Sequence, residues 1–474
     1  MTALSSLSRE HRTLAARGEE LVVTSPADGA VVGGVRQHLA EDLPEILARA
    51  RAGSLVAKCL SRHDRASVLE RAADLLRDRS EAVADLIVAE AGKTIRQARK
   101  EVSRCQNTLK LSAAQARSNA GEVIPFDAYE GEETRTGWFT REPLGIIVAI
   151  TPYNDALNLV AHKVGPAIAG GNSIILKPSQ LTPLTARLLV DLLVEAGLPA
   201  EVITTVHGDR RLSQALVSAR EVRMVSFTGG FRTGEAIAAS AGIKKVAMEL
   251  GGNAPVLVFA DADLEAAIGR CVSGSFWAAG QNCIGTQRII VHESIVERFR
   301  TAFVAAASEL TVGDPRQETT DVGPMISTAA ARSAEEAVEA AVRAGAELLL
   351  GGRAEGHIFP PTVLTDVPRE QCVWAEEAFA PIVVIEAFST FEEAVDLANE
   401  PEYALHAAVF TGSLATAMRA TRELDAGAVM VNDSSDYRFD AMPFGGAKYG
   451  SMGREGVRFA YEDMTQTKVV GILE

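Results

Sequence analysis

Glu249 and Cys283 are the two side chains whose types and surroundings most directly suggest chemistry. Cys283 lies in the small, polar segment GQNC, and Glu249 lies between an apolar run and two glycines in KVAMELGG. A thiolate can attack a carbonyl carbon, with backbone N–H groups available to the resulting oxyanion. A carboxylate at the end of a strand could act as a general base on water. Because a lone cysteine is more often inert core and a strand-end glutamate is commonly just solvated, the pair is a hypothesis that other residues must support.

Three further segments place polar groups at the ends of predicted strands. Asn154 ends the segment TPYN and could donate its amide to an oxyanion, although Pro-Tyr-Asn is also ordinary turn chemistry. Lys177 ends the run SIILK, where a lysine is usually on the surface but could reach a ribose or a phosphate. The run FTGGFRTG, residues 227–234, follows a strand and opens a helix, whose N-terminal amides suit a pyrophosphate. It matches neither GxGxxG nor a P-loop, so this run alone is weak evidence.

The composition limits the classes of protein and partner. A chain of 474 residues is too long for one hydrophobic core, so two or more domains are expected. The net charge of −15 disfavours a nucleic acid or an anionic membrane as the main partner, because both require a basic footprint. The five cysteines are scattered without CxxC or zinc spacing, so we expect neither a disulfide scaffold nor a metal site. With no signal-peptide core and no long apolar stretch, a cytoplasmic protein without a membrane span is expected.

The elements that must position these residues follow from the hydrophobic periodicity. Between residues 41 and 115, apolar residues recur at three- and four-residue spacing, which predicts helices. From Leu144 onward, short apolar strands alternate with helices, which predicts a doubly wound parallel sheet. A second set of alternating strands and helices predicts another α/β domain over residues 252–435. The boundary falls beside Glu249, and a cleft between domains is a usual place for a small-molecule site.

Three segments outside this alternation are expected to form β structure. The turn residues in SPADGAVVGG predict a hairpin within the first 40 residues. The alternating stretch TRTGWFTRE, within 125–143, predicts an exposed pair of strands. The tail TQTKVVGILE predicts a strand that pairs with the 125–143 segment or with another subunit.

Taken together and in this order, the segments resemble the aldehyde dehydrogenase superfamily. The matching pieces are TPYN, LKPS, FTGG-x3-G, MELGGN, GQNC, EEAFAP at 376–381 and PFGG at 443–446. They cover about residues 140–450, and the spacing of ELGG and GQNC is highly specific. The resemblance implies an α/β fold with a Rossmann-like cofactor-binding domain (1–124 and 144–251, with a return segment 436–460), a catalytic domain (252–435) and an oligomerisation β element (125–143 and 461–474). It also implies a homodimer or homotetramer.

The resemblance implies a role for each candidate in the oxidation of an aldehyde. Cys283 would attack the aldehyde carbonyl, while Asn154 and the backbone N–H of Cys283 hold the oxyanion. Hydride transfer to the nicotinamide would leave a thioester, and Glu249 would activate the water that releases the acid. Each role suits the chemistry of its side chain.

The resemblance also implies the cofactor-binding set. Lys177 and Glu377 would bind riboses, Phe379 would lie against the nicotinamide side, and Gly229 and Gly234 would let the backbone approach the pyrophosphate. The full set is Thr151, Pro152, Tyr153, Lys177, Ser179, Gln180, Gly208, Phe227, Thr228, Gly229, Gly230, Gly234, Leu250, Gly251, Glu377 and Phe379.

This chain departs from the family's pattern at several of these positions. Asn253 replaces the lysine of ELGGK, Ala380 replaces a glycine of EEIFGP, and Gly230 replaces the serine of FTGS. Gln180 replaces an acidic residue that would favour the ribose of NAD and repel a 2′-phosphate. Arg210 and Arg211, on a predicted loop, could supply a cation for that phosphate, so NADP is possible, although NAD is the expected cofactor.

The resemblance favours a small, polar aldehyde, with an anionic one preferred and a phosphonate, phosphorylated or hydroxy aldehyde as the candidates. The segments NLVAHK, ELGGN and YRFDAMPFGGAKYGSMGREGV resemble the branch holding phosphonoacetaldehyde, lactaldehyde and non-phosphorylating glyceraldehyde-3-phosphate dehydrogenases. An arginine on a helix is more often solvated, and a histidine on a helix is more often part of the core. The resemblance nevertheless favours substrate binding by Arg104 and His162. Asn282 replaces an arginine of the phosphate-using relatives, so part of the anion site is missing or rebuilt. The expected substrate-binding residues are Arg104, His162, Asn282, Ile284 and Arg438.

Two other functions remain as alternatives. A CoA-acylating semialdehyde dehydrogenase would release the thioester to CoA, but the presence of Glu249 as a hydrolytic base argues against it. A catalytically inactive binding paralogue would be expected to have lost the nucleophile or the base, and both Cys283 and Glu249 are present.

Overall fold

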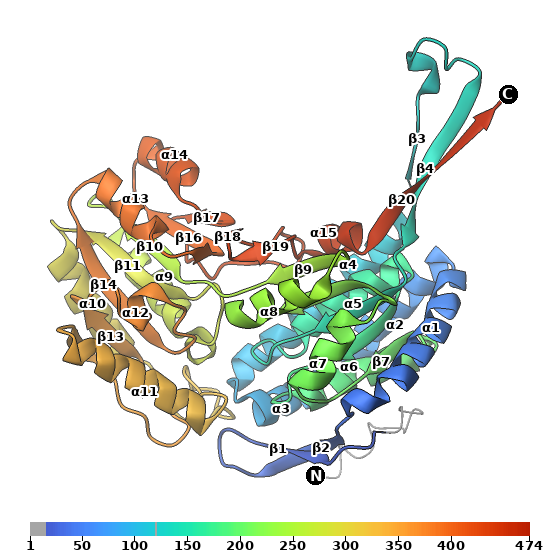
Figure 1. Ribbon diagram of the computed structural model, residues 1–474. Helices are drawn as coiled ribbons and strands as arrows, with labels where there is room; N and C mark the ends of the chain where they lie inside the picture. The colour runs from blue at the N-terminus through green and yellow to red at the C-terminus, as the bar shows by residue number, and fades with distance from the viewer. Residues whose placement is uncertain (1–15, 119–120) are drawn as a thin grey trace.

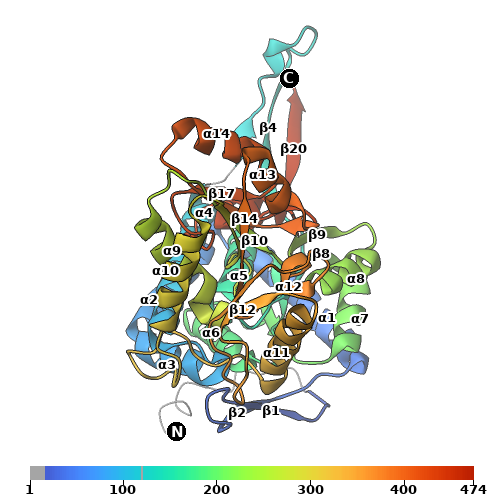
Figure 2. The same ribbon diagram turned by 90° about the vertical axis from the view of Figure 1, so that its left-hand side faces the viewer.

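The computed structural model describes residues 16–118 and 121–474. It contains two mostly parallel sheets flanked by helices, and a narrow three-stranded arm projects from the body (Figure 1; Figure 2). The predicted α/β class with two doubly wound sheets is therefore confirmed. Each sheet also has one antiparallel edge strand, which the strand–helix alternation did not predict.

The first sheet has the strand order β19-β9-β8-β5-β6-β7. Ile147 and Ala149 of the central strand β5 pack into one core, whereas Ile146, Val148 and Ile150 pack into a second core on the opposite face. Helices cover both faces, so the strand is an unbroken apolar run rather than an alternating one. The strands are β5 (Ile146–Ile150), β6 (Ser173–Lys177), β7 (Ile203–Thr205), β8 (Val222–Thr228), β9 (Lys245–Glu249) and β19 (Ser451–Met452).

The helices of this half include the predicted N-terminal group. In α4, residues Ile95, Ala98, Val102, Cys105 and Leu109 recur every three or four positions and are buried in the first core. The helices are α1 (Leu43–Cys59), α2 (Arg62–Asp78), α3 (Ser80–Ala91), α4 (Ile95–Ser118), α5 (Asn158–Gly170), α6 (Pro183–Glu195), α7 (Arg210–Ser218), α8 (Phe231–Ala241) and α15 (Val457–Asp463).

The second sheet has the order β12-β13-β14-β11-β10-β16-β17 and its own core. Its strand β13 is missing from the sequence prediction, because four residues after a proline pair are too short to show a period. The strands are β10 (Ala254–Val258), β11 (Thr286–His292), β12 (Glu347–Leu350), β13 (Thr362–Thr365), β14 (Ile382–Phe388), β16 (His406–Phe410) and β17 (Ala428–Val431). The helices are α9 (Leu264–Phe276), α10 (Val296–Ser308), α11 (Thr328–Arg343), α12 (Cys372–Ala375), α13 (Phe391–Asn399) and α14 (Leu414–Glu423).

The arm consists of β20, β4 and β3 in that order, so the chain's tail pairs with the 125–143 segment as predicted. The prediction of two strands within TRTGWFTRE is wrong: β4 is one continuous strand, because β20 pairs along its whole length. The remaining elements are β1 (Glu20–Thr24), β2 (Val31–Arg36), β3 (Gly121–Val123), β4 (Arg135–Pro143), β15 (Tyr403–Ala404), β18 (Ala447–Lys448) and β20 (Thr465–Leu473). The predicted N-terminal hairpin is β1 and β2. Among the described residues, no helix is long and apolar enough to cross a membrane.

Candidate active site

Glu249 is the last residue of β9, at the carboxyl end of the first sheet. Its side chain is buried, and its Oε2 atom has no hydrogen-bond partner in the described chain. Burial raises the pKa of Glu249 well above its ordinary value, and the nearby carboxylate of Glu455 raises it further, whereas Lys163 and Arg438 lower it. The site therefore holds a carboxyl group that takes up a proton far more readily than a solvated glutamate.

Cys283 lies on the loop between the end of α9 and β11, in the second half of the chain. The loop begins with three left-handed residues, Ala278, Ala279 and Gly280, at φ 52°, 54° and 67°. Two of them are not glycine, so the backbone there is strained, a feature that often marks functional sites. A Cβ atom at Gly280 would lie 2.1 Å from the backbone oxygen of Ala380, so the loop is also locked against the EEAFAP segment.

Two glycines bring Glu249 and Cys283 into the same region. A Cβ atom at Gly252 would lie 2.3 Å from the carbonyl oxygen of Cys283, and one at Gly251 would lie 2.6 Å from a carboxylate oxygen of Glu377. The backbone after Glu249 can pass this close only because neither position has a side chain. The ELGG segment thus carries Glu249 and packs against both Glu377 and the loop that contains Cys283.

The thiol itself is half-buried and packs beside Ile284, Leu405 and Phe444. Burial raises the pKa of Cys283 above its ordinary value, Glu377 raises it further, and the positive charge of Arg438 lowers it. Burial therefore disfavours the thiolate of Cys283, and Arg438 is a charge that favours it.

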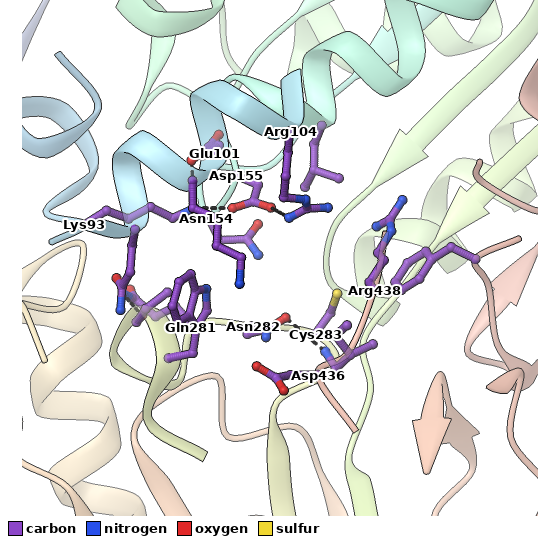
Figure 3. Close-up of a pocket in the computed structure, with 17 residues that line it drawn as sticks. Lys93, Glu101, Arg104, Asn154, Asp155, Gln281, Asn282, Cys283, Asp436 and Arg438 are labelled. Carbon is purple, nitrogen blue, oxygen red and sulfur yellow. Dashed lines mark hydrogen bonds and ion pairs between the residues drawn. The ribbon is translucent and has the colours of Figure 1, made fainter. Parts of the chain in front are cut away.

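Cys283 opens into a pocket that both halves of the chain line (Figure 3). Five residues predicted from sequence converge on it with Cys283: Asn154, Asn282, Ile284, Arg104 and Arg438. The sequence interpretation missed the other lining residues, which are Lys93, Gln97, Lys100, Glu101, Asp155, Leu159, Trp277, Ala278, Gln281, Asp436 and Phe444. A signal for some of them was present, because positions 93, 97, 100, 101 and 104 follow helical spacing and form one polar stripe.

One wall of the pocket is an ion-pair network centred on Asp155, the residue after Asn154. Figure 3 shows Asp155 between Lys93 and Arg104, which bind its two carboxylate oxygens. Lys93 also lies 2.7 Å from Glu101, and Arg104 lies 3.3 Å from Asp440. The positive charge of Arg104, expected to face an anionic substrate, is therefore already balanced by two carboxylates.

His162 does not line the pocket that contains Cys283, and its role in substrate binding stays a prediction. It lies on α5, whose residues are all buried, and it is 1% exposed and absent from the pocket lining. Its Nε2 atom lies 3.3 Å from Asp440 and 3.5 Å from Thr108. At this position α5 packs against α4, so His162 is a buried, hydrogen-bonded residue between the two helices.

Arg438 reaches the pocket from the segment that returns to the first sheet. Its Nη2 atom lies 3.2 Å from Glu455, and its guanidinium lies 3.7 Å from the centre of the Phe444 ring. Its Nε atom is buried without a hydrogen-bond partner in the part of the chain that the structure describes. Arg438 thus retains a donor close to Cys283.

The predicted cofactor residues lie along the carboxyl ends of the first sheet. Because parallel strands end at one edge, the segments after β5, β6, β7, β8 and β9 meet there. Residues at or directly after these strand ends are Thr151, Pro152, Tyr153, Lys177, Ser179, Gln180, Gly208, Phe227, Thr228, Gly229, Gly230, Leu250 and Gly251. Gly234 lies in α8, where a Cβ atom would lie 2.3 Å from Leu250.

A groove opens at this edge, beside the start of α8. It is lined by Gly230, Gly251 and Glu377 from the predicted set, together with Arg232 and Arg369, which the sequence interpretation missed. Residues of α8 and α12 line it, and Figure 1 shows these two helices in different halves of the molecule. Glu377 accepts a hydrogen bond of 3.1 Å from the N–H of Gly252, and burial raises the pKa of Glu377 to about 7. The ring of Phe379 packs edge-to-face on Tyr153, with centroids 5.8 Å apart.

The residues at this edge suit a dinucleotide. Gly230 precedes the first turn of α8, so N-terminal amides are available to a phosphate. The hydroxyl of Thr151 is buried and has no hydrogen-bond partner in the described chain, and the buried amine of Lys177 ends β6. The prediction that Arg210 and Arg211 lie on a loop is wrong, because Asp209 caps α7 and both arginines begin that helix.

Comparisons with known proteins agree with this arrangement. A model of the aldehyde dehydrogenase family matches residues 14–470. An aspartate-semialdehyde dehydrogenase of Pseudomonas canavaninivorans is 61% identical over 448 residues, which cover 94% of this chain and 95% of that protein. A 3-sulfolactaldehyde dehydrogenase of Priestia aryabhattai is 42% identical over 411 residues, 86% of each chain.

Solved structures of aldehyde dehydrogenases also match this chain over almost its whole length. A glyceraldehyde-3-phosphate dehydrogenase of Methanocaldococcus jannaschii, in complex with NADP, matches with a TM-score of 0.93 and 39% identity. The match covers 97% of this chain and 100% of that chain. This chain therefore belongs to the aldehyde dehydrogenase family and is an NAD(P)-dependent aldehyde oxidoreductase.

Proposed function

We propose that this enzyme oxidises a small aldehyde bearing an anionic group to the carboxylic acid, through a thioester on Cys283. The proposal rests on one observation: Cys283 and Asn154 line one polar pocket, and Glu249 leads directly into the glycines that pack on the Cys283 loop. The first sheet would bind the dinucleotide, and the second half of the chain would supply the nucleophile.

The first step is attack by the Cys283 sulfur on the aldehyde carbon, with loss of the thiol proton. Asn154 would donate its side-chain amide to the oxygen that becomes negative, a contribution that is large when the donor is held in place. Asp155 is fixed by Lys93 and Arg104, so the neighbouring Asn154 is held by the same network. NAD(P)⁺, when bound, accepts the hydride from the former aldehyde carbon, and Cys283 is left with an acyl group.

The second step is hydrolysis of the thioester. Glu249 would take a proton from water, the resulting hydroxide would form the new C–O bond, and the C–S bond would break to release Cys283 and the acid. The raised pKa of Glu249 matches this task, because a base with a pKa closer to neutrality takes up the proton of water more effectively.

The anionic substrate class is supported by the relatives and by the pocket. The names of the relatives include aldehydes bearing a carboxylate, a sulfonate and a phosphate. In this chain Lys100 and Arg438 line the pocket, while Arg104 is held by carboxylates and Asn282 stands in place of a cation. These residues suit a small anion bound near the pocket's opening.

The proposed mechanism is tested by two variants and one control. Cys283→Ala should lower kcat by about 10⁴-fold or more, and Cys59→Ala, which changes an exposed cysteine at the end of α1, should not. Glu249→Gln should release one NAD(P)H per site rapidly and then turn over slowly, because acylation survives and hydrolysis does not. A panel of succinate semialdehyde, phosphonoacetaldehyde, lactaldehyde, glyceraldehyde-3-phosphate and propanal provides the substrates. Undiminished activity in Cys283→Ala, or a product that forms only with CoA, would overturn the proposal.

The arm gives a basis for assembly as a homodimer or homotetramer. Its apolar side chains are open to solvent in the single chain: Val123 is 82% exposed, Val469 is 62% exposed and Leu473 is 65% exposed. Projecting strands with apolar residues on their surface commonly form contacts between subunits. Light scattering of the wild type and of Val469→Lys would measure the subunit number and its dependence on the arm.

A further inference from the structure

Two opposite charges in the substrate pocket stand apart from the ion pairs around them. Lys93, Glu101, Arg104 and Asp155 pair among themselves or with Asp440. Arg438 pairs with Glu455. Within the described chain, Lys100 and Asp436 also line the pocket and neither has an ion-pair partner within 4 Å. They are therefore the charged side chains whose partner a ligand could supply.

Lys100 comes from the polar stripe of α4. Its Nζ atom lies 4.5 Å from the centre of the Trp277 ring, and Trp277 is itself part of the pocket lining. This cation–π contact holds the amine at the pocket while leaving its hydrogen-bond donors available.

Asp436 comes from the segment after β17, two residues before Arg438. It lies on the side of the pocket away from Asp155, past Asn282 and Cys283 (Figure 3). Burial raises the pKa of Asp436, whereas a hydrogen bond with Ser434 and the positive charge of Lys100 lower it. Both side chains line the same small pocket as Cys283 and Asn154, so one small ligand in that pocket can contact both charges.

A cation and an anion that line one small pocket suit a ligand that itself carries an anion and a cation. The α-carboxylate and α-ammonium groups of an amino acid share one carbon, so they can meet Lys100 and Asp436 at the same time. An aldehyde with only a carboxylate, sulfonate or phosphate would bring a second anion into the pocket with the partly buried carboxylate of Asp436, and repulsion between the two like charges is unfavourable.

We infer that the substrate is the semialdehyde of an amino acid, with its carboxylate on Lys100 and its ammonium group on Asp436. The inference deepens the proposed function and rests on it. Asp436 is the specificity-determining residue, because it separates an amino-acid semialdehyde from the same aldehyde without the amine. The 61% identity to an aspartate-semialdehyde dehydrogenase supports a four-carbon substrate of this class.

Two aldehydes that differ only in the amine test the inference. L-Aspartate semialdehyde and succinate semialdehyde have the same chain and carboxylate, and kcat/KM for each is measured on the full-length enzyme. The wild type should prefer L-aspartate semialdehyde. Asp436→Asn should lower kcat/KM for it by about 10- to 100-fold, and change succinate semialdehyde by less than about 3-fold, because an ionic hydrogen bond is lost for only one of them. Lys100→Met should lower kcat/KM for both.

Controls separate this result from a general defect. Asp425→Asn changes an exposed acid of the same half of the chain, which lies 3.9 Å from Lys448 and does not line the pocket, so it should leave both substrates unaffected. Asp436→Glu should restore part of the preference. Activity of Asp436→Asn on succinate semialdehyde shows that the variant is folded.

The inference and the proposed function fail in different ways. A wild type that prefers succinate semialdehyde, or an Asp436→Asn variant that loses both substrates equally, overturns the amino-acid inference and leaves thioester chemistry standing. If instead Cys283→Ala oxidises these aldehydes as well as the wild type does, the proposed function falls and the inference falls with it.

Discussion

The α-carbon of Gly252 packs directly on the backbone of Cys283, so that a Cβ atom there would lie 2.3 Å from the Cys283 carbonyl oxygen. Gly252 follows Glu249 by three residues, and this contact makes the base and the nucleophile parts of one rigid unit although they come from different halves of the chain. The carbonyl oxygen of Cys283 belongs to the backbone and cannot move aside as easily as the end of a flexible side chain. Position 252 therefore has no room for a side chain.

Gly252→Ala should therefore lower kcat by about 100-fold with a smaller change in KM for the cofactor, because a shift of about 1 Å in a reacting atom has that effect. Gly269→Ala is the matched control, since Gly269 lies in α9 and a Cβ atom added there would meet no other atom within 4 Å. Steady-state kinetics and a thermal melt of both variants provide the measurement. Equal kcat values for the two variants would show that the contact does not position Cys283.

Arg104→Ala should affect anionic and neutral aldehydes alike. The guanidinium is bound by Asp155 and Asp440, so its loss disturbs the wall beside Asn154 rather than a substrate anion. We expect kcat for succinate semialdehyde and propanal to fall by the same factor, within about 3-fold, and the protein to lose about 3 kcal/mol of stability because two carboxylates lose a partner.

Arg99→Ala is the control for this change, because Arg99 is an exposed arginine of the same helix that pairs with Glu81 and Glu318. Arg99→Ala should lower the free energy of unfolding by less than about 1 kcal/mol. A selective rise in KM for the anionic aldehyde in Arg104→Ala would instead show that Arg104 binds the substrate's charge.

The comparison of Glu249 with Arg104 shows what the sequence can and cannot predict. Glu249 and Lys177 were predictable because each ends an apolar strand, and parallel strands bring their carboxyl ends to one edge of a sheet. Arg104 depends on Asp155 and Asp440, which are 51 and 336 residues away in the chain. The local sequence pattern does not show ion pairs between residues so far apart. The sequence therefore suggested that the positive charge of Arg104 was free to bind a substrate, whereas two carboxylates already bind it.

The same limit applies to His162 and Asp436. Helical spacing showed that His162 is on a helix but not that the helix is buried all round. Asp436 lies in a segment without regular structure, so no period marks it, and only the fold brings it to the polar stripe of α4.

Gln180→Glu should shift the enzyme from NADP towards NAD. Gln180 lies on the exposed turn after β6, where its amide donates a hydrogen bond of 3.2 Å to Gln37. A carboxylate there would accept a hydrogen bond from the ribose 2′-hydroxyl of NAD and repel the 2′-phosphate of NADP. We expect the ratio of kcat/KM for NAD over NADP to rise by about 10-fold or more. Gln180→Ala, which removes the amide without adding charge, should change the ratio much less, and an equal change in both variants would contradict the charge argument.

The stability of the protein should fall as the pH rises because of Glu90, a buried residue of α3. Its carboxyl group accepts hydrogen bonds from the N–H groups of Leu184 and Thr185 at the start of α6, and burial raises its pKa from 4.5 to about 7. Between these two values the folded protein keeps a proton that the unfolded chain has released, so folding is favoured at low pH and this contribution is lost as the pH rises to about 7.

Glu90→Gln removes the titration while keeping an acceptor for the helix start. The difference in unfolding free energy between wild type and variant should therefore change by about 3 kcal/mol between pH 4.5 and pH 7.5, to the disadvantage of the wild type at the higher pH. Denaturant unfolding of both proteins across this range measures it, and taking the difference cancels the titration of every other group. A constant difference would mean that Glu90 has the same pKa in the folded and unfolded chains. A change of the opposite sign would mean that the hydrogen bonds from α6 outweigh the effect of burial and keep Glu90 ionised.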